Sequence, residues 1–93
     1  MSQTMAEQWE VMKEEVRNAA NRLIDDFPEH RARMISYPYL AEVFCQLPTP
    51  TDMNSFYHRQ IEMSAFLGTV DNERAALRTD RMFSLHFPTR PIS

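Results

Sequence analysis

The sequence predicts an all-α protein, a small bundle of three to four helices followed by an extended C-terminal tail. Its 93 residues include a single glycine, whereas the hairpins of a β fold need several turn residues that accept positive φ. Apolar side chains recur at steps of three and four residues, which is the helical period. A chain of this length with 43% hydrophobic residues fits one compact domain with a small stability margin. We therefore expect a helical domain over residues 1–79 and an extended tail over residues 80–93.

The first helix is expected to begin after Thr4. Thr4 and Glu7 have the spacing of a capping box, in which each side chain accepts a hydrogen bond from the other residue's backbone N–H. The helix should end before Pro28, and Asp26 is expected to cap one or two further turns that lead to Ile35. Apolar residues spaced alternately by four and three form a seam that packs against other helices, or against a second copy of the chain. These residues are Met5, Trp9, Met12, Val16, Ala19 and Leu23.

Two further helices are expected on either side of a proline-rich elbow. Pro38 suits the first turn of a helix because its missing N–H would be unpaired there. Pro48 and Pro50 end that helix, and Thr49 or Thr51 is expected to cap the next one. Each helix has an apolar stripe, formed by Tyr39, Leu40, Val43, Phe44 and Leu47 on the first and by Met53, Phe56, Tyr57, Ile61, Ser64 and Leu67 on the second.

The stripes of these three helices must face one another to form a core. Gly68 follows the last stripe and is expected to break or kink the third helix, and residues 71–78 have helical composition but few large apolar groups. From Asp80 onward, apolar residues alternate at period two, which indicates an extended segment. The predicted core comprises Trp9, Met12, Val16, Leu23, Leu40, Val43, Phe44, Phe56, Tyr57 and Ile61.

The composition argues against several classes of function. A formal net charge of −3 provides no basic surface for phosphates, so we expect no direct binding of nucleic acid. No apolar run approaches the roughly 20 residues of a membrane span, and the N-terminus has no hydrophobic signal segment. We therefore expect a cytoplasmic protein without membrane contact. The single cysteine, Cys45, lies on an apolar stripe and is expected to be a buried thiol.

The sequence contains no catalytic signature. His58 and Glu62 lie four residues apart on one helix face, but a tetrahedral metal site needs three or four ligands. Ser55 and His58 lack an orienting acid, and Cys45 has no histidine at a defined spacing. With one glycine, the chain cannot form a glycine-rich phosphate loop. We expect no enzyme activity, no cofactor and no metal, and we interpret the chain as a protein-binding module.

Three segments resemble a known family. Pro38-Tyr39-Leu40-Ala41-Glu42 follows the pattern proline, any residue, aliphatic, alanine, glutamate of the theta subunit of bacterial DNA polymerase III and its phage homologue. Ser55-Phe56-Tyr57 with Ile61 stands where that family has a serine or similar residue, two aromatics and an aliphatic. Residues 16–20 are similar to its alanine-rich first helix, and the resemblance covers about residues 12–70. It implies a three-helix accessory subunit of DNA replication that binds and stabilises the proofreading exonuclease subunit and has no activity of its own.

A second hypothesis is a phage- or plasmid-encoded inhibitor, an anti-defence or anti-activator protein that binds a host protein. Small size, acidity and the lack of catalytic residues fit both hypotheses. In either case, the partner-binding residues are expected to be large apolar side chains of the helices and the tail. They are Trp9, Met12, Tyr39, Phe44, Tyr57, Phe83, Leu85 and Phe87.

The tail suggests a further partner. Met82-Phe83-Ser84-Leu85-His86-Phe87 resembles the hexapeptide by which bacterial replication proteins bind the sliding clamp, although Met82 replaces its glutamine. Leu85 and Phe87 would fill the clamp's apolar pocket, because alternate side chains of an extended peptide point the same way. The alternative is that Phe83, Leu85 and Phe87 fold back and cover the domain's own apolar face.

Overall fold

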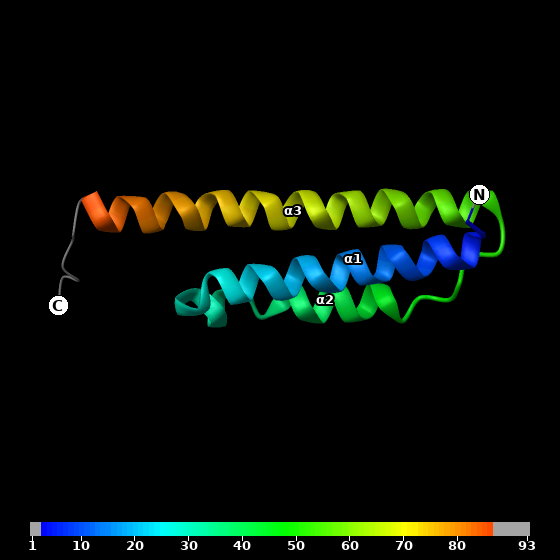
Figure 1. Ribbon diagram of the computed structural model, residues 1–93, viewed down its shortest axis with the longest axis horizontal. Coiled ribbons are helices and arrows are strands. Elements are labelled where there is room, and N and C mark those ends of the chain that lie inside the picture. The colour runs from blue at the N-terminus through cyan, green and yellow to red at the C-terminus, as the bar shows by residue number, and fades with distance from the viewer. Residues whose placement is uncertain (1–2, 87–93) are drawn as a thin grey trace.

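The computed structural model describes residues 3–86, which form three α-helices and one short 3-10 helix and contain no strand (Figure 1). Helix α1 spans Met5–Asp26, the 3-10 helix η1 spans Pro28–Met34, α2 spans Ser36–Cys45 and α3 spans Met53–His86. In Figure 1, α1 and α3 run in the same direction, and α2 returns antiparallel to them. The predicted all-α bundle is therefore confirmed.

Helix α1 is the element on which the other helices pack. Its capping box is confirmed, since the Thr4 N–H donates to Glu7 Oε1 at 2.9 Å and the Glu7 N–H donates to Thr4 Oγ1 at 3.1 Å. Helices α2 and α3 both lie along α1, and the α1 stripe is buried within the chain. Most of the predicted seam is therefore covered by helices of the same chain. The buried α1 residues are Trp9, Met12, Val16, Ala20 and Leu23.

The core forms two clusters along α1. The first surrounds Trp9, whose ring centroid lies 5.0 Å from that of Phe44 on α2, and it also includes Phe56 of α3. The second lies where α1 meets η1, and comprises Leu23, Phe27, Met34, Val70 and Leu77. Because both clusters contain residues of α1 and α3, they hold these two parallel helices together over most of the length of α1.

The junction between α1 and η1 differs in detail from the prediction. Asp26 does not cap η1, because its carboxylate pairs with Arg74 of α3 instead. Phe27 ends α1 by donating its N–H to the Leu23 carbonyl at 3.2 Å, and η1 begins at Pro28. The predicted one or two turns before α2 are present as η1.

Helix α3 is capped by Asp52, and not by Thr49 or Thr51. The Ser55 N–H donates to Asp52 Oδ1 at 2.7 Å, and the Ser55 hydroxyl donates to the Asp52 carbonyl at 3.1 Å. Aspartate is at least as good a cap as threonine, and its charge is favourable at a helix N-terminus. The capping chemistry was correctly expected in this loop, but at the wrong residue.

Helix α3 continues through Gly68, so the predicted break is wrong. Gly68 does not have a positive φ, and glycine inside a helix costs only about 1 kcal/mol relative to alanine. Val70 and Leu77 lie beyond it and are buried in the second cluster. Burial of such side chains contributes about 1.5–3 kcal/mol each, so tertiary packing outweighs the local cost of glycine.

The same helix includes the start of the predicted tail. Residues 80–86 are helical, so the extended conformation expected from Asp80 is wrong for this segment. Arg81 holds it against η1, because its guanidinium donates to Glu29 at 2.6 Å and lies 4.4 Å from the centroid of the Phe27 ring. The rest of the predicted tail, residues 87–93, lies outside the described residues.

Four of the ten predicted core residues are exposed. Leu40, Val43, Tyr57 and Ile61 are 44–59% exposed, because α2 and α3 each turn a different face toward α1. The buried face of α3 contains Phe56 and, later, Val70 and Leu77, while α2 buries Ala41 and Phe44. The prediction missed six core residues, which are Ala20, Phe27, Met34, Ala41, Val70 and Leu77.

Candidate protein-binding face

An open groove lies between α2 and α3. Both helices pack on α1, and they contact each other where the centroid of the Tyr37 ring lies 6.3 Å from that of Phe66. Part of their facing sides nevertheless remains uncovered. The groove has a volume of about 330 Å³. Its residues come from both helices and are Leu40, Val43, Phe44, Leu47, Glu62, Ala65 and Phe66. With a single charged member, this set suits apolar side chains of another molecule.

Further exposed apolar side chains lie on the two helices that form the groove. Tyr39 precedes Val43 by one helical turn on α2 and is 69% exposed. On α3, Tyr57 and Ile61 precede Ala65 at steps of four residues, which places the three on one helix face. We call this surface the docking face, and define it by Tyr39, Leu40, Val43 and Leu47 of α2 and Tyr57, Ile61 and Ala65 of α3.

The polar groups at one end of the core are held by internal contacts. Arg59 donates to the Pro48 carbonyl at 3.0 Å, and its guanidinium lies 5.5 Å from the centroid of the Trp9 ring. Lys13 lies 5.7 Å from the same centroid and pairs with Glu10 at 2.8 Å. These side chains cover Trp9, so this aromatic ring stabilises the fold and is not a surface anchor.

The predicted partner-binding residues fall into three groups. Trp9, Met12 and Phe44 are at most 6% exposed and belong to the core, and Phe44 also lines the groove. Tyr39 and Tyr57 are exposed on the docking face. The sequence prediction of the site missed Leu40, Val43 and Ile61, although the same periodic stripes contained them and placed them in the core.

Phe83 is 56% exposed, but it lies 26 residues beyond Tyr57 on α3, a separation of about 39 Å along the helix axis. Leu85 also belongs to α3, and Phe87 lies outside the described residues. Since residues 82–86 are helical, clamp binding through the hexapeptide would require the end of α3 to unwind. Phe83 is therefore far from the α3 residues of the docking face.

Ion pairs fix the far end of α3 to the junction of α1 and η1. Arg33 Nε lies 2.8 Å from Glu73 Oε2, and Arg74 pairs with Asp26. The Arg81 guanidinium hydrogen-bonds Glu29, which holds the pKa of that carboxyl below its ordinary value. These pairs connect α3 with η1 and with the end of α1.

The described residues offer little for catalysis. The Cys45 thiol donates to the Lys13 carbonyl at 3.6 Å, and burial raises its pKa, so it is a poor nucleophile at neutral pH. No group of three or more His, Cys, Asp or Glu side chains in residues 3–86 is placed to hold a metal ion.

Within the same residues, no helix combines the length and apolar character that crossing a membrane requires. Compared with known proteins, the chain matches no family model, no curated protein and no solved structure.

Proposed function

We propose that the chain is a non-catalytic binding module that covers an apolar surface of a partner protein with its docking face. One observation carries this proposal. Leu40, Val43, Tyr57 and Ile61 have the spacing of core residues, yet they are 44–59% exposed. Leu40 and Val43 line the apolar groove, and Tyr57 and Ile61 share a helix face with Ala65, which also lines it. Single exposed apolar residues are ordinary, whereas a contiguous patch across two helices is typical of an interaction site.

The favoured partner is the proofreading exonuclease subunit of a DNA polymerase. Two of the segments that resemble the theta family contribute Tyr39, Leu40, Tyr57 and Ile61 to the docking face. Phe56 of the second segment is buried in the first core cluster with Trp9. An apolar helix face of the partner would place its side chains in this groove, and the chain would act as a cytoplasmic accessory subunit of replication.

Binding should stabilise both proteins. A chain of this size buries a modest share of its surface and has a small stability margin. A partner that binds only the folded chain increases the free energy of unfolding in proportion to the logarithm of its concentration over Kd. This supports a stabilising accessory role and requires no catalytic group.

Isothermal titration calorimetry against the exonuclease subunit tests the proposal with a matched pair of variants. Val43 on the docking face and Val11 on α1 are 44% and 46% exposed, so Val43→Asp and Val11→Asp introduce the same charge at similarly exposed sites. We expect Val43→Asp to weaken binding roughly 30-fold, as a change of about 2 kcal/mol at a central interface residue does. Val11→Asp should bind like the unmodified chain.

Each outcome has a defined meaning. Circular dichroism should show that both variants remain folded, since surface substitutions usually change stability by less than about 0.5 kcal/mol. Equal weakening by both variants, or by neither, would contradict the docking face. Absence of heat with the unmodified chain at tens of micromolar would remove the exonuclease as partner and leave the inhibitor hypothesis.

A further inference from the structure

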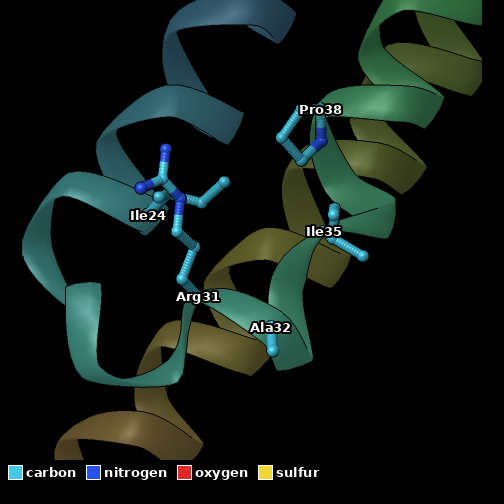
Figure 2. A pocket seen from close by; sticks show the side chains of 5 residues that line it. All are labelled: Ile24, Arg31, Ala32, Ile35 and Pro38. Carbon is cyan, nitrogen blue, oxygen red and sulfur yellow. The ribbon is translucent and has the colours of Figure 1, made fainter.

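A second pocket lies at the opposite end of α2, where α1, η1 and α2 meet. Its volume is about 460 Å³, within the usual range of small-molecule sites, about 300–1,000 Å³. The apolar walls are formed by Ile24 of α1, Ala32 of η1, Ile35 and Pro38, and Arg31 is the one charged residue among the described residues that line the pocket. In Figure 2, Arg31 extends from η1 toward Ile24, while Ile35 and Pro38 lie across the pocket.

Arg31 differs from the other arginines near this junction. Arg33, Arg74 and Arg81 each pair with a carboxylate of another element. Arg31 has no acidic partner among the described residues, and it is exposed. An unpaired guanidinium beside apolar walls is free to accept an anionic group, whereas its neighbours are already neutralised by their partners.

We propose that this pocket binds a small carboxylate with an apolar body, such as a medium-chain fatty acid. The guanidinium presents two parallel N–H donors that match the two oxygens of a carboxylate. Ile24, Ala32, Ile35 and Pro38 would cover the alkyl chain and remove its surface from water. A single cation suits a monoanion, and the chain's net charge of −3 disfavours a ligand with several negative charges.

The pocket is separate from the docking face. It shares no lining residue with the groove between α2 and α3, and the charged residue of that groove is Glu62, an acid. A carboxylate ligand should therefore enter the Arg31 pocket and avoid the groove. This site does not depend on the proposed protein partner, and its test needs only the chain itself.

The test is an NMR titration of the full chain with sodium decanoate below its critical micelle concentration. Decyltrimethylammonium, with the same alkyl chain and a positive head, is the control ligand. We expect saturable shifts of the backbone amide signals of Ile24, Ala32 and Ile35 with decanoate, and none of these shifts with the cation. Equal binding of both amphiphiles, or shifts centred on Val43 and Ile61, would overturn the proposal.

Two variants test the role of the guanidinium. Arg31→Gln should weaken decanoate binding at least about tenfold, because a hydrogen bond to a charged group is lost. Arg78→Gln removes an exposed arginine of α3 that does not line the pocket and should leave the Kd unchanged. Unfolding temperatures check that both variants fold. Unchanged affinity for decanoate in Arg31→Gln would refute the proposal. It would also be refuted if decanoate caused no shifts of these amide signals, whereas a peptide with an acidic and an apolar side chain did.

Discussion

Replacing Leu77 with alanine tests whether the second half of α3 belongs to the core. Leu77 is fully buried in the second cluster, nine residues beyond the glycine at which the sequence predicts a break. The substitution removes three carbon atoms, worth about 2.4 kcal/mol of transfer free energy, and leaves a cavity that adds to the cost. We expect the free energy of unfolding to fall by about 3 kcal/mol, and the unfolding temperature by about 12–24 °C for a domain of this size.

Urea denaturation followed by circular dichroism measures this loss. Met82→Ala is the control, because Met82 lies on the same helix beyond Leu77 and is 62% exposed; its effect should be within about 0.5 kcal/mol. A loss below about 1 kcal/mol for Leu77→Ala would lie outside the range for a buried leucine. That result would refute the packing of α3 beyond Gly68 and would support the helix break that the sequence predicts there.

Two further predictions concern α3 and its ion pairs. Gly68→Ala should raise the free energy of unfolding by about 0.5–1 kcal/mol, since an added Cβ meets no atom within 4 Å; destabilisation in urea would contradict a continuous helix there. Glu29 has a lowered pKa because Arg81 hydrogen-bonds its ionised form, so its contribution is present above the ordinary glutamate pKa of roughly 4.3 and is lost as pH falls through the lowered value. Glu29→Gln should therefore be less stable than the unmodified chain at pH 7 and equally stable near pH 2, and a stability difference that does not change with pH would exclude this ion pair.

The helix ends that depend on neighbouring residues could be predicted from the sequence. The capping box at Thr4 and the end of α1 before Pro28 depend on backbone hydrogen bonds within a few residues, and both were predictable. Gly68 and the segment from Asp80 were predicted wrongly because their structure is decided by contacts distant in sequence. Leu77 packs in a cluster with Leu23, and Arg81 binds Glu29. Neither contact can be inferred from the spacing of apolar residues or from helix propensities.

The docking face shows a related limit. The spacing of Tyr57 and Ile61 indicates an apolar helix face. The spacing alone does not show whether that face packs within the chain or stays exposed to another molecule. Phe56, adjacent to Tyr57, is buried instead, which corresponds to a rotation of about 100° around the helix axis. The sequence pattern therefore identified Leu40, Val43, Tyr57 and Ile61 as apolar helix positions but assigned all four to the core, where the structure has them exposed.

Helix α2 links the stability of the chain to binding. It has ten residues and buries only Ala41 and Phe44, and a helix this short is marginal in water without tertiary contacts. Its opposite apolar residues, Tyr39, Leu40 and Val43, remain exposed. A partner on the docking face would bury this second side and contact α3 at the same time, adding to the contact that Tyr37 of α2 already makes with Phe66 of α3. A bound partner would therefore cover the exposed stripe of α2 and stabilise this short helix.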